Sequence, residues 1–316
     1  MSYKIKSNII VLILLILTIP LFATSDSGES AYQFLKLQFV PLSAGLGNIT
    51  SPLEGYSDAG FTNFSATPFS ANRRLFFTYN KLYADINGGL FGYIYPLKSG
   101  AKTGGTVKFI SYGSMTKTDD TGKVLGEFSA QSISFDGFYA MEILNRMGVH
   151  TAVKFIYEGI DDYNSFGVAL DFGALYKFSK ARGTIGLNAR NVGFQLKGFT
   201  EEHKDPLPIT FLIGGNWNPK GLPLKLYAEL EQNLDDPSIY KAGILLDEIE
   251  PIILSIGYTH REKIDSDTFK DEEKYNGLSA GIGLNLKDNG LDFHYAYSSY
   301  GLLGSTHKFS IGYVLE

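Results

Sequence analysis

The stretch at 165–178, SFGVALDFGALYKF, is almost wholly apolar, yet it contains Asp171 and Lys177. From Phe166 onward every second residue is apolar and mostly large, whereas the intervening positions are mostly small or polar. Successive side chains of a β-strand point to opposite faces. The stretch therefore predicts a strand with one apolar face and one face that carries both charges.

The same alternation recurs along the chain after residue 72 and predicts about fourteen strands. They cover 73–83, 85–96, 103–115, 123–142, 149–157, 164–178, 183–196, 207–217, 223–232, 238–247, 250–261, 275–287, 290–299 and 305–315. Many of them have ten residues or more, whereas strands of soluble proteins typically have about 5–6. This length favours an all-β chain that forms one large barrel.

The connections between these strands fall into two largely alternating sets. One set is short, and it includes 97–102, 144–148, 179–183, 218–222, 247–250 and 287–290. The other set is mostly longer and more acidic, and its candidate partner-binding residues are Asp119, Asp120, Asp161, Asp162, Glu201, Glu202, Asp265 and Asp267. Short turns on one side and longer loops on the other are typical of outer-membrane barrels. The even strand count then puts both chain ends on the short-turn side.

In such a barrel the apolar face of each strand meets lipid and the other face meets a polar lumen, and the sheet closes so that every backbone group is paired. The side chains predicted to face the lumen are Asp171, Lys177, Lys225, Glu229 and Glu231. The alternative is a soluble barrel with an apolar interior. Small residues dominate the less apolar face, which is unusual for a solvated surface. The sequence therefore predicts a transmembrane, up-and-down antiparallel β-barrel.

The N-terminus supports export. Lys4 and Lys6 precede the apolar run IIVLILLIL, and the small residues Ala23 and Ser25 follow it. This order is typical of a signal peptide, here predicted over 1–25. The alternative is a membrane anchor, but the apolar run falls short of the roughly 20 residues that span a bilayer. We therefore expect a chain of the bacterial outer membrane.

Two further segments complete the predicted organisation. Residues 26–72 alternate poorly and are rich in Gly, Ser, Asn and Pro, and residues 73–316 form the barrel. The first segment is predicted to fold into the lumen as a plug, because a barrel of this size would otherwise enclose a hole. A periplasmic extension is the alternative.

Several stretches resemble the PorV/PorQ family of outer-membrane proteins, and most closely its PorQ branch. They are SAYQFLKLQFVPLSAGLG at 30–47, TNFSATPF at 62–69, ISYGSMTKTDDTGKVLGEFSAQ at 110–131, YNSFGVALDFGALY at 163–176, NVGFQLKGF at 191–199 and DPLPITFLIGG at 205–215. The resemblance implies a fourteen-stranded barrel of the fatty-acid-transporter type with an N-terminal plug. It also implies a role in the attachment machinery of the type IX secretion system, with a PorZ-like surface protein, a PorU-like sortase and a PorV-like barrel as partners.

The sequence departs from that family in two places. The family's Asn-Pro-Ala site reads Asn63-Phe64-Ser65-Ala66 here, with Pro68 displaced, and the chain ends in Glu316 instead of an aromatic residue. The first departure concerns the turn of the plug. The second concerns how the last strand is recognised during assembly.

Two functions follow from these patterns. The first is a non-enzymatic scaffold that anchors surface partners through its acidic loops. The alternative is a transporter of hydrophobic small molecules such as long-chain fatty acids, with an apolar pocket around Phe34, Leu35, Phe39 and Phe61. No catalytic, cofactor or metal residues are predicted, because the five His residues are scattered and the chain has no Cys. The net charge of -5 gives no footprint for nucleic acid.

Overall fold

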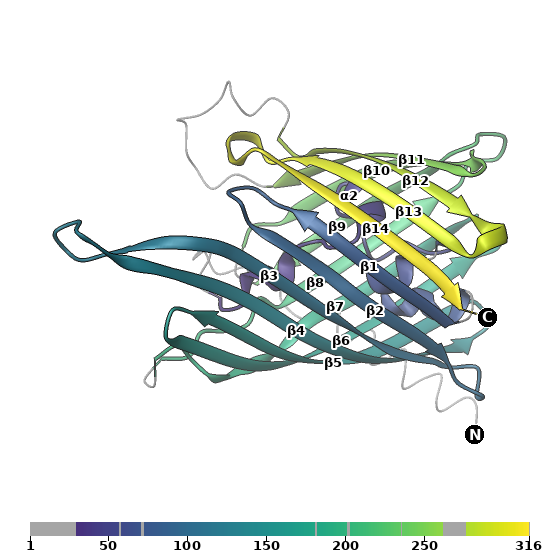
Figure 1. Cartoon of the computed structure of the whole chain (residues 1–316). Coiled ribbons are helices and arrows are strands. Elements are labelled where there is room, and N and C mark those ends of the chain that lie inside the picture. The colour runs from purple at the N-terminus through teal and green to yellow at the C-terminus, as the bar shows by residue number, and fades with distance from the viewer. Residues whose placement is uncertain are drawn as a thin grey trace.

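The computed structural model describes residues 30–56, 58–70, 73–180, 182–200, 203–234, 236–261 and 276–315. Within these residues, fourteen antiparallel strands form one closed barrel in which each strand pairs with its neighbours in the chain and β1 pairs with β14 (Figure 1). The strands are β1 (Arg73–Lys81), β2 (Asn87–Pro96), β3 (Lys102–Thr118), β4 (Val124–Leu144), β5 (Met147–Ile160), β6 (Tyr163–Phe178), β7 (Gly183–Lys197), β8 (Thr210–Trp217), β9 (Lys225–Asn233), β10 (Ile239–Ile249), β11 (Ile252–Arg261), β12 (Leu278–Leu286), β13 (Leu291–Ser299) and β14 (Ser305–Leu315). The predicted fold class is confirmed.

One end of the barrel, the turn end, carries the start of β1 and the end of β14, and the opposite end is the loop end (Figure 1). The prediction of mostly longer connections at the loop end is wrong for most of them, because β1–β2, β3–β4, β9–β10 and β13–β14 are joined by five residues each, as many as join β2 to β3 at the turn end. The β5–β6 connection consists of Asp161 and Asp162 only, because β5 reaches Ile160 and β6 begins at Tyr163. In this sector the strands themselves are long, up to 21 residues in β4.

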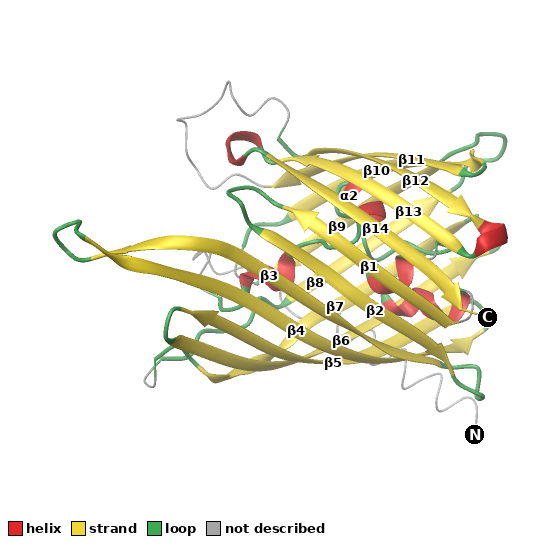
Figure 2. Cartoon of the chain, in the orientation of Figure 1, coloured by secondary structure: helices red, strands yellow, loops and turns green. Residues whose placement is uncertain are grey.

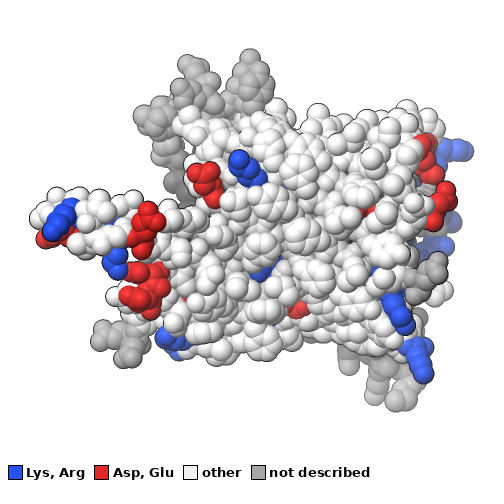
Figure 3. Space-filling view, viewed as in Figure 1, with Lys and Arg blue, Asp and Glu red and all other residues white. Residues whose placement is uncertain are grey.

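The outer surface of the wall is apolar. Along β6, Phe166, Leu170 and Phe172 are exposed, whereas Ala169 and Asp171 are buried. Figure 3 shows a broad belt on the visible side with few charged atoms, and most charged side chains lie at the two ends of the barrel. A largely apolar belt of this kind is the surface that a barrel presents to lipid.

A hairpin of β3 and β4 extends past the rest of the loop end (Figures 1 and 2). Pairing of β3 with β2 ends at Ser111, and pairing of β4 with β5 ends at Ala130. The remaining residues of the hairpin pair only with each other, as far as the pair Thr118 and Val124. The hairpin is therefore a two-stranded ribbon outside the closed wall.

Residues 30–70 lie inside the barrel, where they form short helices and turns (Figure 1). The helices are η1 (Gln33–Lys36), α2 (Pro41–Gly45), η2 (Ala59–Phe61) and η3 (Phe64–Phe69), and two more, η4 (Lys287–Asn289) and η5 (Gly301–Leu303), lie between strands of the wall. We call residues 30–70 the plug. Among the described residues, no helix is both long and apolar enough to cross a membrane.

The plug packs against apolar patches on the inner face of the wall. Phe61 stacks on Phe76 of β1, with 4.7 Å between ring centroids, and Phe64 stacks on Phe138 of β4 at 4.2 Å. A second cluster joins Leu46 and its plug neighbours to Tyr227, Leu245 and Ile253. The lumen is thus a packed core as well as a polar interior.

Glycines in the wall allow the plug backbone to approach closely. A Cβ atom at Gly186 would overlap the carbonyl oxygen of Ser51, and one at Gly257 would overlap the backbone at Gly47. Any side chain at these two positions would push the plug away from the wall.

Candidate functional site

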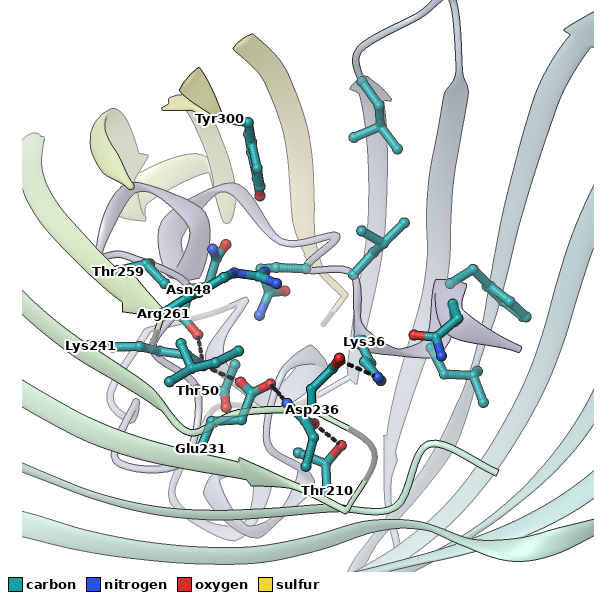
Figure 4. Close-up of a pocket in the computed structure, with 18 of the residues that line it drawn as sticks. Lys36, Asn48, Thr50, Thr210, Glu231, Asp236, Lys241, Thr259, Arg261 and Tyr300 are labelled. Atoms are coloured by element: carbon teal, nitrogen blue, oxygen red, sulfur yellow. Dashed lines mark hydrogen bonds and ion pairs between the residues drawn. The ribbon is translucent and has the colours of Figure 1, made fainter. Parts of the chain in front are cut away.

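A cavity of about 460 Å³ lies between the plug and the loop end of the wall. We call it the vestibule. The plug contributes residues 33–38, Asn48 and Thr50, and the wall contributes residues near the loop ends of β1, β2, β9 to β11 and β13 (Figure 4). Because these segments are far apart in the sequence, the vestibule exists only once the barrel has closed around the plug.

One side of the vestibule is apolar. Leu35 and Leu37 of the plug face Leu82 and Ile86 of the β1–β2 connection, and Tyr112 of β3 lies beside them. These side chains pack against the larger of the two buried hydrophobic clusters. This side can accept the hydrocarbon part of a ligand.

The other side of the vestibule is polar (Figure 4). The ammonium of Lys36 lies 2.6 Å from a carboxylate oxygen of Asp236, and Lys241 lies 2.6 Å from Glu231. Asn48, Thr50, Thr210, Thr259, Arg261 and Tyr300 supply further polar groups. The vestibule is therefore amphipathic, with ion pairs on its polar side and with Arg190 of β7 as a further charged residue in its lining.

A buried carboxylate fixes the plug beneath this polar side. Glu229 of β9 accepts hydrogen bonds from the backbone N–H of Thr50 at 3.1 Å and of Ser51 at 2.5 Å, and from the Ser51 hydroxyl at 2.6 Å. Lys241 of β10 lies 2.8 Å from the same carboxylate. These charge-assisted bonds, shielded from water, tie the plug to the wall.

Further polar contacts between plug and wall run toward the turn end. Glu54 pairs with Lys177 at 2.6 Å, and the hydroxyl of Tyr56 donates to Asp247 at 2.6 Å. Lys225 lies 2.7 Å from that same Asp247 carboxylate. Burial, reinforced by the carboxylate of Asp247, raises the pKa of Tyr56 far above its usual value. The Tyr56 hydroxyl therefore stays protonated and acts as a donor.

The structure places all five predicted lumen residues on the inner side of the wall. Asp171 lies 2.7 Å from Lys154 of β5 and accepts a hydrogen bond of 2.8 Å from the backbone N–H of Asn191. Lys177, Lys225 and Glu229 contact the plug, and Glu231 pairs with Lys241. The five do not form one site. No pattern in the sequence indicated the plug partners of Lys177, Lys225 and Glu229, which lie more than a hundred residues away.

The four apolar residues predicted to line a pocket are divided between two cavities. Phe34 lines the vestibule, and Leu35 lines both cavities. Phe39 and Phe61 line a second cavity of about 40 Å³ that also contacts Lys108 and Asp136. The second cavity is far below the 300–1,000 Å³ of typical small-molecule sites, so the vestibule is the candidate ligand site.

The predicted acidic loop residues do not converge on one place either. Asp119 and Asp120 lie in the turn of the β3–β4 hairpin, and Asp162 lies in the β5–β6 turn. Asp161 pairs with Lys117 of the hairpin. Hydrogen bonds from the side chain of Thr121 and the backbone of Lys123 lower the pKa of Asp119. Glu201, Glu202, Asp265 and Asp267 fall outside the described residues, as do the signal peptide predicted over 1–25 and Glu316.

One pair of side chains inside the barrel has a feature of a catalytic site. His150 and Ser65 are 2.6 Å apart, but both are buried at the junction of plug and wall, and the cavity beside His150 is the one of about 40 Å³. Among the described residues, no group of three or more His, Asp or Glu side chains is arranged to hold a metal ion. Of the two cavities, the vestibule is the one large enough to bind a small molecule.

The fold matches solved outer-membrane channels. The Pseudomonas putida toluene transporter TodX aligns with a TM-score of 0.61 and 10% sequence identity over 87% of this chain and 96% of that chain. The CymD monoaromatic hydrocarbon channel gives 0.60 and 8% over 89% and 97%. A Pseudomonas aeruginosa FadL homologue gives 0.54 and 9% over 88% and 98%.

Sequence comparison adds nothing to this likeness, since no family model and no curated protein matches the chain. Identities near 10% establish a shared fold and no more. The apolar belt and this fold make the chain a bacterial outer-membrane β-barrel, as predicted. Its resemblance to the PorV/PorQ family stays a prediction.

Proposed function

We propose that the chain is an outer-membrane channel that binds small amphipathic molecules in the vestibule and admits them past the plug. The observation that carries this proposal is the division of the vestibule into an apolar side and a charged side. Its volume of about 460 Å³ suits one small molecule. Proteins of the same fold include a toluene transporter and a monoaromatic hydrocarbon channel, which favours ligands with a hydrocarbon part.

Equilibrium binding of radiolabelled decanoate and of toluene to the purified barrel in detergent tests this proposal. Leu82→Gln puts a polar group on the apolar side of the vestibule, and we expect it to weaken binding by about tenfold. Leu302→Gln is the matched control, because Leu302 is 57% exposed and does not line the vestibule. Failure of the wild type to bind either compound, or equal binding by the two variants, would contradict the proposal.

A second candidate function is the non-enzymatic scaffold of the type IX secretion and attachment machinery. The β3–β4 hairpin favours it, because Val124 and Leu125 near its tip are 63% and 59% exposed. A two-stranded ribbon is at best marginally stable in water on its own, so a partner protein would stabilise it. PorZ-like, PorU-like and PorV-like proteins are the partners to look for.

Deleting residues 114–128 tests the scaffold. Because the hairpin pairs with β2 and β5 only below this segment, we expect the shortened protein to assemble as a barrel and to lose its surface partners in a mild-detergent pull-down. Retention of all partners by the shortened protein would exclude the hairpin as their attachment point.

A further inference from the structure

Among the described residues, four buried or partly buried cations of the inner wall pair with carboxylates, whereas a fifth, Lys308, does not. Arg74 pairs with Asp292, Lys108 with Asp136 and Lys154 with Asp171, and Lys241 pairs with both Glu229 and Glu231. Lys308 of β14 is only 2% exposed, yet within the described part of the chain it forms no ion pair with any carboxylate. Its ammonium donates one hydrogen bond, of 2.9 Å, to the hydroxyl of Thr306.

The register of three strands surrounds Lys308 with small polar side chains. Asn80 of β1 and Ala296 of β13 lie directly opposite Lys308 on its two neighbouring strands. One step toward the turn end, Ser310 lies between Thr78 and His294, and one step toward the loop end, Thr306 lies beside Ser298. All of these residues are at most 8% exposed.

Several hydrogen-bonding groups in this cluster have no partner in the described chain. They are the hydroxyls of Ser298 and Ser310 and the side-chain oxygen of Asn80. An ammonium carries three donors, and two of those of Lys308 remain after Thr306 is counted. Buried polar groups are normally hydrogen-bonded, so the unpartnered Ser298 hydroxyl and the two remaining donors of the Lys308 ammonium point to a ligand.

We propose that Lys308, with the hydroxyls of Thr306 and of Ser298 beside it, binds a small anion such as chloride or phosphate on the inner wall of the barrel. The site lies just below the vestibule, because Leu82 and Tyr300, which line the vestibule, follow Asn80 on β1 and Ser298 on β13 by two residues each. The nearest acid on β13, Asp292, is already occupied by Arg74. The proposal does not depend on the vestibule being a transport site.

Charge balance explains why an anion is the fitting ligand. A buried ammonium with no counter-ion is strongly disfavoured, and either it loses its proton or an anion accompanies it. The hydroxyls of Thr306 and Ser298, which lie beside the Lys308 ammonium, can donate hydrogen bonds to such an anion. The same donors could receive an inorganic ion or the anionic head group of a molecule that enters the vestibule.

The direct test is to locate bound bromide in a crystal of the protein, and it needs no variant. Crystals of the full-length wild type soaked in sodium bromide should show an anomalous peak within hydrogen-bonding distance of the Lys308 ammonium. Absence of a peak there, while bromide binds elsewhere on the protein, would overturn the proposal.

Thermal unfolding in detergent provides the second test. At constant ionic strength, chloride or phosphate should raise the midpoint of the wild type above its value in gluconate, by about 2–4 °C. Lys308→Met should abolish this rise. Lys81→Met is the control, because it removes an exposed positive charge one residue from Asn80 and should keep the rise. An equal rise in Lys308→Met, or none in the wild type with any anion, would refute the site.

The source of the anion is resolved by adding decanoate and decanol to the same experiment. Stabilisation by chloride or phosphate identifies a free inorganic ion. Stabilisation by decanoate alone, absent with decanol and lost in Lys308→Met, identifies a carboxylate head group held by the same side chains.

Discussion

Two buried lysines on the inner wall, Lys241 of β10 and Lys308 of β14, show how differently one barrel can hold a charge. Lys241 contacts two carboxylates, Glu229 and Glu231, and the first of these also holds the backbone of the plug. Among the described residues, Lys308 has only a hydroxyl partner, on Thr306. In the β9–β10 sector the buried charges are therefore paired with one another and with the plug. In the β13–β14–β1 sector several described hydrogen-bonding groups have no partner.

The difference teaches where this barrel is built for stability and where it is available for binding. A fully paired buried charge rigidifies its surroundings, and removing one partner is costly. A buried charge without a partner adds no stability by itself. Such a charge can be retained in a folded chain if a bound ligand of opposite charge pairs with it.

The largest expected effect is the removal of the compensated lysine. Lys241→Met leaves Glu229 and Glu231 as unpaired buried carboxylates, and we expect it to lower the free energy of unfolding by about 3–5 kcal/mol. Urea titration of the refolded barrel measures this change.

The matched variant, Lys308→Met, makes the same substitution without stranding a carboxylate. In gluconate, without a small anion, we expect no loss of stability, because replacing an uncompensated buried charge by an apolar side chain is neutral or favourable. A loss as large as that of Lys241→Met would erase the distinction between the two sectors.

A substitution on the outer face extends the comparison from the inner wall to lipid. Leu170 of β6 is exposed on the belt, and Leu170→Arg should cost about 2–4 kcal/mol if the residue lies near the bilayer midplane. Urea titration in lipid vesicles measures the loss. Leu302→Arg, in the exposed η5 segment at the loop end, is the control and should be nearly neutral.

A smaller effect is expected where the plug meets β9 and β10. Tyr56→Phe removes the hydroxyl that donates to Asp247 and should lower the free energy of unfolding by about 1–2 kcal/mol at pH 7. The pKa of Tyr56 is raised in the folded protein, so the stability it contributes is present below pH ~10 and falls as the pH rises further. The difference between wild type and Tyr56→Phe should therefore shrink above pH ~10, and a constant difference in urea titrations would argue against this contact.

The smallest effect belongs to the loop end. Lys117 pairs with Asp161 in solvent, where such pairs contribute little. We expect Lys117→Ala to leave the urea midpoint unchanged. A measurable loss would mean that the hairpin is part of the stable wall.

The wall could be predicted from the sequence because its signal is local. Alternation of Phe166, Leu170 and Phe172 with Ala169 and Asp171 fixes the strand and its faces within a few residues. The predicted loop length failed at the β5–β6 connection, where an acidic composition indicates a loop but the two strands extend further. The acidic pair at 161–162 suggested a longer loop, but β5 and β6 continue their pairing up to Ile160 and Tyr163.

The interior could be predicted only in part, because its contacts join distant segments. Glu229 was expected to face the lumen, but its bonds to Thr50 and Ser51 depend on how the plug folds. Lys308 was missed altogether, since its alternation with Phe309 resembles that of any wall residue. What sets Lys308 apart is the identity of its neighbours across two strand pairings.

The central claim is that alternate residues of every strand face lipid and a polar, plug-filled lumen. The chain has no Cys, so single cysteines can be introduced on β11 and β14 and labelled with bimane in vesicles that contain brominated lipid. We expect quenching for Ile256→Cys and Ile311→Cys, which point outward, and none for Ser255→Cys and Ser310→Cys, which point inward. Quenching of the serine positions in preference to the isoleucine positions would contradict the claim.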